Sequence, residues 1–247
     1  MKDAAAGSAF GTKKLDFEHT LTIMLLSSAN GETKMNRRSF IKNTLIAAAA
    51  AAGSSVFGRA ARALSERSNK MKILVLTGSP RKNGNSNTLA DNFIKGAEEA
   101  GHEVVRFDSA FKNVHPCIAC NSCGMNGPCV FKDDFEFVRR HIVDADMVVF
   151  ATPMYYFGIS AQLKAVIDRF YAINGQIHRP KKAALLMTYA DSGAAEAEPI
   201  KTHYKVLLDY LGWEDTGQII APGVWSAGAV NRTAYPEQAY ELGKNIK

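Results

Sequence analysis

Cysteine is scarce in this sequence, and the few cysteines present are not spread along it. Four occur among 247 residues, and all of them lie between Cys117 and Cys129. Such crowding excludes a disulfide framework that links distant loops, as small secreted proteins have. It is typical instead of a local ligand cluster.

Excess charge of one sign is also nearly absent from most of the chain. The formal net charge is +6, but residues 1–63 hold nine Lys and Arg against four Asp and Glu, whereas residues 64–247 hold 21 against 20. The basic character therefore belongs to the amino-terminal segment. The rest of the chain lacks the electrostatic footprint of a nucleic-acid-binding protein, and we expect no nucleic-acid partner.

Long hydrophobic runs and the motifs of hydrolytic enzymes are missing as well. The apolar run at residues 45–57 is rich in Ala and interrupted by Gly53, Ser54 and Ser55, so it is too short and too weakly apolar to predict a membrane span. The chain has no HExxH motif, Ser-His-Asp arrangement or pair of carboxylates that would point to hydrolysis.

An export signal is predicted from Met35 onward. Arg37 and Arg38 give it a cationic start, the apolar run at residues 45–57 follows, and an A-x-A site ends it at residues 61–63. The paired arginines resemble the twin-arginine type, whose translocon carries folded proteins. We therefore expect a periplasmic protein. The alternatives are an anchor that is not cleaved and a chance pair of arginines before an Ala-rich helix.

These features divide the chain into three parts. Residues 1–34 are an upstream extension, and Met35 is the expected start because export signals normally begin within a few residues of the initiating methionine. Residues 35–63 are the signal peptide. Residues 64–247 are one domain, into which a cysteine segment at residues 115–132 is inserted.

Within this domain, strands and helices alternate. Residues 72–78 are a continuous apolar run that ends in Gly, as expected of a strand buried on both faces. Asp133 and Glu136 predict a capping box, and Ser160 predicts another helix start. Further strands are predicted at residues 103–108, 146–151, 182–189 and 218–220, and helices at residues 88–100, 133–145, from Ser160 onward, 199–211 and 236–247.

Five strands that alternate with helices predict an α/β fold with one doubly wound, mostly parallel sheet. In such sheets the ligand binds beyond the carboxyl ends of the strands, at the point where the strand order reverses. The loops that follow the first, third and fourth strands all reach that edge. We therefore expect the functional site to be built from these three loops.

The first of these loops, residues 78–87, suits a phosphate group. It holds two glycines, an arginine, three asparagines and two serines between a strand and the amino terminus of a helix. Backbone N–H groups converge there with the positive end of the helix dipole. The loop has neither the GK[ST] ending of a Walker loop nor a GxGxxG pattern, which argues against a nucleoside triphosphate or a Rossmann-bound dinucleotide.

Three segments together carry a resemblance to a known family. They are GSPRKNGNSNTLADNF from residue 78, CIACNSCGMNGPCVFKDDF from residue 117 and ATPMYYFGISAQLKAVIDRF from residue 151. They resemble the flavodoxin-like family of NADPH-dependent FMN reductases, especially its iron–sulfur flavoprotein branch. The resemblance implies strand order 2-1-3-4-5, FMN as cofactor, NAD(P)H as electron donor, and dimers or tetramers. It also implies that the FMN phosphate is held by Ser79, Arg81, Asn85, Ser86, Asn87 and Thr88.

The two other loops are expected against the isoalloxazine ring of the flavin. A flat apolar ring favours aromatic and backbone contacts, and N–H groups near it stabilise negative charge on the reduced ring. The loop at residues 189–193 is expected to close over the far edge, through Tyr189 and Asp191. The candidates in the loop after the third strand are Pro153, Met154, Tyr155, Tyr156, Phe157 and Gly158.

The cysteines follow the pattern C-x2-C-x2-C-x5-C. Three thiolates at intervals of three residues wrap around one corner of a cubic cluster, and a fourth closes the shell, so a [4Fe-4S] cluster is the leading hypothesis. Thiols without metal, either free or locally paired, and a zinc site are the alternatives. The four candidate ligands are Cys117, Cys120, Cys123 and Cys129.

Together these features predict an FMN-dependent oxidoreductase whose reactive group is the flavin itself. We therefore assign no catalytic side chain. The resemblance implies NAD(P)H as donor, but nicotinamides are made in the cytoplasm, so export favours a redox protein or a quinol. The acceptor is a small molecule or a protein. The alternatives are a non-enzymatic periplasmic electron carrier and a flavin or thiol redox sensor.

Overall fold

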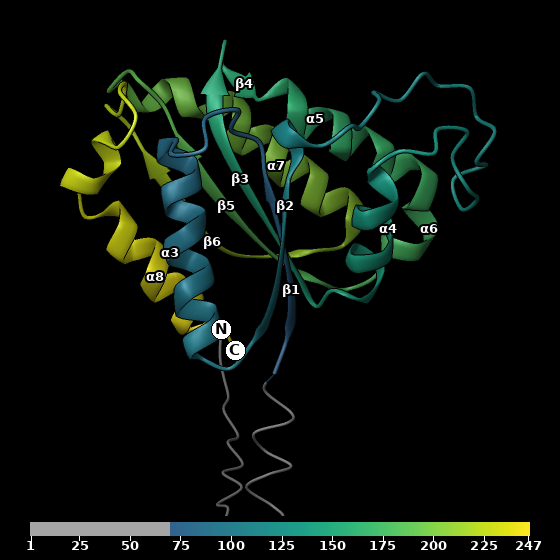
Figure 1. The fold of residues 1–247 in the computed structure, drawn as a ribbon, viewed down its shortest axis with the longest axis horizontal. Helices are drawn as coiled ribbons and strands as arrows, with labels where there is room; N and C mark the ends of the chain where they lie inside the picture. Colours follow the sequence, from purple (N-terminus) through teal and green to yellow (C-terminus); the bar gives the residue numbers. More distant parts are fainter. Residues whose placement is uncertain (1–69) are drawn as a thin grey trace, which may run out of the picture. The chain divides into compact units, whose positions relative to one another are not determined.

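The computed structural model describes residues 70–247, and the predicted extension and signal peptide at residues 1–63 lie outside them. The described residues form a parallel sheet between two helical layers (Figure 1). The five long strands confirm the predicted order 2-1-3-4-5. Across the sheet they are β2 (Glu103–Asp108), β1 (Lys72–Thr77), β3 (Met147–Tyr155), β5 (Lys182–Thr188) and β6 (Glu214–Ala221).

A short strand that the sequence did not predict pairs with the end of β3. This strand, β4 (Gly158–Ile159), pairs antiparallel with the end of β3, where Met154 faces Ile159 and Tyr155 faces Gly158. The segment after the third strand is therefore a β-hairpin that rises from the carboxyl edge of the sheet (Figure 1).

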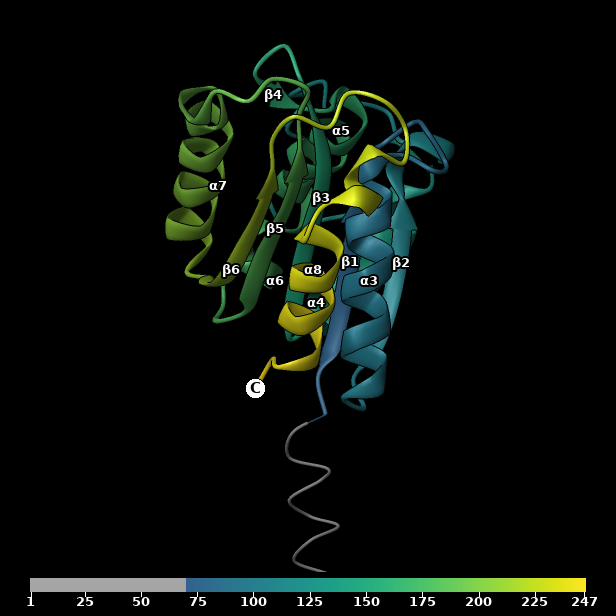
Figure 2. The same ribbon diagram turned by 90° about the vertical axis from the view of Figure 1, so that its left-hand side faces the viewer.

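Both faces of the sheet are covered, as the apolar strands predict. Helices α3 (Asn85–Glu99) and α8 (Tyr235–Lys244) cover one face, and α7 (Glu198–Leu211) lies on the other (Figure 2). Helices α4 (Phe135–Asp144) and α5 (Ala161–Asp168) share one hydrophobic core with α7. The short helices are η1 (Ser109–Phe111), η2 (Arg169–Ile173), α6 (Asn174–Ile177), η3 (Ala194–Ala197) and η4 (Ala229–Arg232).

The two cores divide the side chains of β1 by the strand period of two. Ile73 and Val75 belong to the core under α3 and α8, whereas Leu74 and Leu76 belong to the core under α4, α5 and α7. All four side chains are at most 2% exposed. This burial explains why the strand is apolar without alternation.

Helices α3 and α8 pack closely because each has a glycine at the contact. A Cβ atom on Gly96 would overlap the carbonyl oxygen of Tyr240, and one on Gly243 would overlap the carbonyl oxygen of Phe93. Since the obstacles are backbone atoms, neither side can yield cheaply. Helix α8 therefore holds α3 in place, and with it the loop that precedes α3.

Two predicted helix starts have different outcomes. The hydroxyl of Ser160 accepts a hydrogen bond from the N–H of Leu163 at 3.4 Å, which confirms the cap of α5. The capping box at Asp133 and Glu136 is wrong. Glu136 pairs with Arg139 at 2.8 Å, and Asp133 bonds to a distant arginine. Asp133 also accepts from the N–H of Phe135 at 3.2 Å, but the reciprocal bond of a capping box is not formed, because Glu136 pairs with Arg139.

Among residues 70–247, the structure contains no helix with the length and apolarity that a membrane crossing requires.

Lys181 precedes β5 and carries a buried ammonium group. Its side chain donates hydrogen bonds to the carbonyl oxygens of Val143, at 3.1 Å, and of Ala145, at the end of α4. Burial, together with the charge of Arg179, lowers its pKa from 10.5 to about 8. Over the window between these two values the unfolded chain keeps a proton that the folded chain has lost.

We expect the free energy of unfolding to rise with pH across that window, because the unfolded state binds more protons there. The rise from this one group is on the order of 2–3 kcal/mol. Urea unfolding of the wild type and of Lys181→Met at about pH 7 and about pH 10 measures it. The wild type should gain more stability than the variant, and equal changes in both proteins would contradict the assignment.

Candidate flavin site

A cavity of about 210 Å³ opens at the carboxyl edge of the sheet. It brings the three predicted loops together, because residues from all of them form its walls. Of the fourteen predicted cofactor residues, eight line it: Ser79, Arg81, Asn85, Ser86, Pro153, Met154, Tyr155 and Tyr189.

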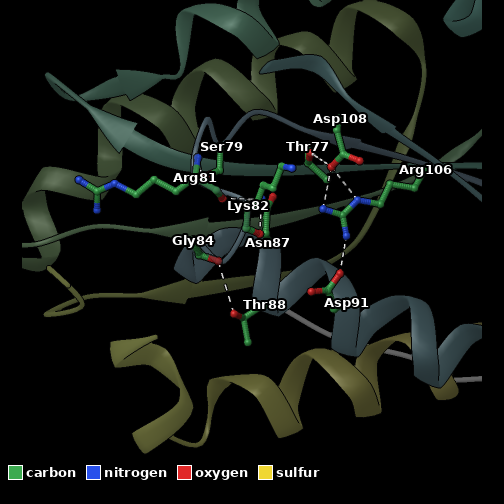
Figure 3. A network of polar contacts seen from close by, with 10 residues as sticks. All are labelled: Thr77, Ser79, Arg81, Lys82, Gly84, Asn87, Thr88, Asp91, Arg106 and Asp108. Carbon is green, nitrogen blue, oxygen red and sulfur yellow. Dashed lines mark hydrogen bonds and ion pairs between the residues drawn. The ribbon is translucent and has the colours of Figure 1, made fainter. Parts of the chain in front are cut away.

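The loop between β1 and α3 is held in shape by its own hydrogen bonds (Figure 3). The Ser79 hydroxyl accepts from the N–H of Arg81 at 3.2 Å and donates to the Arg81 carbonyl at 3.3 Å. The Asn87 amide donates to the carbonyls of Arg81, at 2.9 Å, and of Lys82, at 3.2 Å. A Cβ on Gly84 would lie 2.5 Å from the Ser79 hydroxyl, so this turn needs glycine.

Two buried polar atoms in this loop have no hydrogen-bond partner among the described residues. They are the hydroxyl oxygen of Ser86 and the side-chain carbonyl oxygen of Asn87. Because α3 begins at Asn85, both lie in its first turn, where backbone N–H groups also lack helical partners. A buried free hydroxyl at a helix amino terminus fits a phosphate group.

Arg81 and Thr88 stand at the margins of the loop. Arg81 is exposed, and Figure 3 shows its side chain reaching away from the loop. Thr88 does not line the cavity, and its hydroxyl donates to the Gly84 carbonyl at 3.4 Å. The first residue can add charge at the mouth of the site, and the second supports the turn.

Asn85 lines the cavity, but its side chain is fully engaged with a distant loop. Its amide nitrogen donates to the carbonyls of Val224, at 2.9 Å, and Ser226, at 3.0 Å, and its oxygen accepts from the N–H of Val230 at 3.2 Å. The side chain therefore holds the segment between β6 and α8 against the loop between β1 and α3, and we call this contact the Asn85 clamp. It leaves no free donor for a phosphate.

This clamp brings in residues that the sequence analysis missed. Trp225 is 79% exposed and lines the cavity from the segment after β6. The signal in the sequence was a tryptophan in the loop after the fifth predicted strand, because that loop also reaches the carboxyl edge of the sheet. The other lining residues that were missed are Gly84, Thr188, Ala190 and Val224.

The hairpin between β3 and β4 displays aromatic side chains beside the cavity. Tyr155 lines the cavity, whereas Tyr156 is 100% exposed and Phe157 is 55% exposed, and neither of these lines it. Gly158 pairs opposite Tyr155 and does not line it either. Of the residues predicted to contact the ring, Pro153, Met154 and Tyr155 therefore lie in the cavity wall, and the turn residues do not.

The turn residues Tyr156 and Phe157 have φ angles of +45° and +62°. Positive φ at both positions is the requirement of a type I′ turn, which favours Asn-Gly. Bulky residues pay about 1 kcal/mol or more each in this region. We expect the double variant Tyr156→Asn, Phe157→Gly to raise the free energy of unfolding by about 1–2 kcal/mol.

Urea unfolding of the flavin-free chain measures this gain. Tyr210→Asn is the matched control, since Tyr210 is a 53% exposed aromatic residue on α7 within an ordinary helical backbone. The control should show no gain. A hairpin variant that is no more stable than the wild type would contradict the strain at the turn.

Hydrogen bonds within the loop after β5 hold that loop in shape. The hydroxyl of buried Tyr189 donates to the Gly193 carbonyl at 3.1 Å. Asp191 does not line the cavity, and its carboxylate accepts from the N–H of Ser192 at 2.6 Å and of Gly193 at 3.4 Å. Tyr189 thus forms part of the wall, while Asp191 shapes the turn.

The cysteine segment lies in the long loop between η1 and α4 (Figure 1), and none of its residues lines the flavin cavity. All four cysteines line one small hollow, whose other walls include Ile118, Val130, Phe131 and Tyr171. The backbone takes positive φ angles between the cysteines, at Ala119, Asn121, Gly124 and Met125.

Four thiols around an apolar hollow are a donor set that fits a soft metal centre. Hydrogen bonding from Ser122 also lowers the pKa of Cys120, which favours the thiolate that metals require. Within residues 70–247, however, no three His, Cys, Asp or Glu side chains are arranged as metal ligands. The metal centre therefore stays a prediction.

A sequence profile described as "NADPH-dependent FMN reductase" matches residues 71–213, which is more than half of the chain. The chain belongs to the NADPH-dependent FMN reductase family. It is therefore a flavin-dependent oxidoreductase, and FMN is the cofactor of its family.

Relatives and solved structures agree with the family. An iron–sulfur flavoprotein of Archaeoglobus fulgidus is 32% identical over 158 residues, covering 62% of this chain and 70% of that protein. Another from Methanocaldococcus jannaschii is 36% identical over 99 residues, covering 40% of this chain and 51% of the relative, about half its length. The NAD(P)H:quinone oxidoreductase of Methanothermobacter marburgensis shares the fold. Its TM-score is 0.60 at 19% identity, over 72% of this chain and 96% of that one.

Proposed function

We propose that this reductase takes electrons from NAD(P)H, through FMN in the cavity, and passes them to a small-molecule or protein acceptor. The observation that carries this proposal is the unpartnered hydroxyl of Ser86, buried at the amino terminus of α3 in the cavity wall. Bound FMN supplies hydride acceptance and one- or two-electron transfer.

The residues of this chain bind and orient the cofactor. Ser79, Ser86 and the N–H groups of the first turn of α3 would hold the phosphate. Pro153, Met154, Tyr155 and Tyr189 would flank the ring, because all four line the cavity. The Asn85 clamp fixes the segment that carries Trp225, so the cavity is shaped before FMN arrives.

We further propose that the four cysteines hold a [4Fe-4S] cluster, which would carry single electrons. Their spacing, their common hollow and the likeness to two iron–sulfur flavoproteins support it. Thiols without metal and a zinc site are the alternatives. A thiol redox sensor would follow from the first of these.

Export and assembly complete the proposal. A twin-arginine signal at residues 35–63 would carry the folded holoprotein to the periplasm, where a redox protein or a quinol could replace NAD(P)H as donor. A homodimer or homotetramer is the assembly expected. A non-enzymatic electron carrier is the second candidate function, because scarce nicotinamide would favour exchange with a partner protein.

The test starts from the full chain purified without oxygen. Flavin absorbance with about four irons and four acid-labile sulfides per chain would support both cofactors. Flavin without iron would reject the cluster and leave an FMN reductase with free thiols, and absence of flavin would reject the flavin site. Sustained NAD(P)H oxidation with a quinone distinguishes an enzyme from a carrier, which would exchange electrons with a protein but turn over slowly.

A further inference from the structure

Arg169 is a charged residue buried at the neck of the cysteine segment. It is the first residue of η2, directly after α5, and only 2% exposed. Its guanidinium donates to the carboxylate of Asp133 at 2.8 and 3.3 Å and to the carbonyl of His115 at 3.0 Å. One side chain therefore contacts both ends of the segment that carries the thiols.

Aromatic rings enclose the same guanidinium. Its central carbon lies 5.4 Å from the ring centroid of Phe131 and 4.8 Å from that of Phe135, within the range of cation–π attraction. The ring of His115 stacks on Phe131 with centroids 4.7 Å apart. These contacts add two more residues, Phe131 and Phe135, to the same anchor.

Asp133 completes the closure. Besides Arg169, its carboxylate accepts from the N–H groups of His115, at 3.0 Å, and Phe135, at 3.2 Å. Burial alone would raise the pKa of Asp133, but the hydrogen bonds from Arg169 and these two amides hold it below its ordinary value. The carboxylate is therefore charged at neutral pH, and it joins both ends of the segment to one cation.

Arg169 also belongs to the wall of the hollow that all four cysteines line. Its Nε atom is buried and has no hydrogen-bond partner among residues 70–247. In the Arg169 side chain, the two terminal nitrogens therefore bond to residues at the neck, and the Nε–H group is left without a partner among the described residues. Donors of this kind tune sulfur-ligated centres through hydrogen bonds.

We propose that Arg169 is a positioning residue that holds the four thiols in their common arrangement. The part of this inference that concerns a bound centre rests on the proposed cluster, whereas the holding of the segment does not. Further contacts support the docking: Tyr171 donates to Asn121 at 2.7 Å, and Gln176 donates to the Asn126 carbonyl at 3.3 Å.

The experiment compares Arg169→Met, Arg169→Lys and Asp133→Asn with the wild type. Arg139→Met is the matched control, because it removes an arginine–carboxylate pair from the exposed side of α4. Hydrogen exchange at residues 113–135 and the rate of thiol alkylation at a fixed pH are measured on metal-free protein. FMN content shows that each variant is folded, since the flavin cavity does not involve these residues.

We expect exchange and alkylation to accelerate about tenfold or more in Arg169→Met, and by less in Asp133→Asn and Arg169→Lys. Arg139→Met should match the wild type. If Arg169→Met fails to retain FMN, the exchange and alkylation rates of Asp133→Asn decide whether the proposal holds. Wild-type rates in a folded Arg169→Met or Asp133→Asn variant would overturn the proposal.

A second measurement separates this inference from the proposed cluster. In iron-loaded protein, Arg169→Met should lower the iron content and shift the midpoint potential of the centre downward, with partial recovery in Arg169→Lys. A wild type that binds no iron, with a segment that opens in Arg169→Met, would reject the cluster and support the positioning role. Unaltered iron content and midpoint potential in Arg169→Met would show that Arg169 does not position the thiols for the cluster.

Discussion

Gly96→Ala is expected to lower the free energy of unfolding by about 3 kcal/mol. The new methyl group would overlap the carbonyl oxygen of Tyr240 in α8, and that obstacle is backbone. The better helix propensity of alanine offsets only about 1 kcal/mol. The helices must therefore move apart, which opens the core beneath Phe93.

Urea unfolding of the flavin-free chain measures this loss. Gly193→Ala is the control, because the nearest atom that its Cβ would meet is the end of the flexible Glu196 side chain, at 3.1 Å. The control should change the free energy of unfolding by less than about 1 kcal/mol. A similarly small effect of Gly96→Ala would show that the two helices are not held in close contact.

Ser86→Ala is expected to weaken FMN binding about 10- to 100-fold while leaving the flavin-free protein as stable as the wild type, or more so. A hydrogen bond to a charged group contributes about 1.5–3 kcal/mol, which this variant would remove from the complex. In the absence of flavin the same hydroxyl is buried and unpartnered, so its removal relieves a desolvation penalty.

Ser109→Ala provides an unusually close control. The hydroxyl of Ser109 is also buried without a partner among the described residues, but it lies in η1 and does not line the flavin cavity. Fluorescence titration with FMN and urea unfolding should show similar stability effects in both variants and weaker binding only in Ser86→Ala. Equal FMN affinities of the two variants would show that the Ser86 hydroxyl does not bind the phosphate group.

The sequence was sufficient for the sheet and for the edge of the sheet at which the cavity opens. Continuous apolar runs such as β1 identify strands buried on both faces, and the strand–helix alternation determines which edge collects the loops. Polar residues that cluster at one such loop, as Ser79 and Ser86 do, then predict where a phosphate group binds. These inferences need only local patterns and a general rule of topology.

Long-range partners decided what the sequence could not predict. Asp133 has the spacing of a helix cap but bonds to Arg169, which is 36 residues away. Asn85 has the chemistry of a phosphate donor but is occupied by a loop about 140 residues further on, between Val224 and Val230. The turn at Tyr156 and Phe157 lacks the Asn-Gly signal of its type.

The Asn85 clamp has a consequence for the order of events during synthesis. The loop between β1 and α3 and the hairpin leave the ribosome before β5 and β6, but the wall formed by Val224 and Trp225, and the helix α8 that supports α3, follow β6 in the chain. Domains in general fold as units once enough of their chain has emerged. The pocket therefore becomes complete only after the segment that follows β6 has been synthesised, so cofactor capture would report that this segment has folded against the rest of the domain.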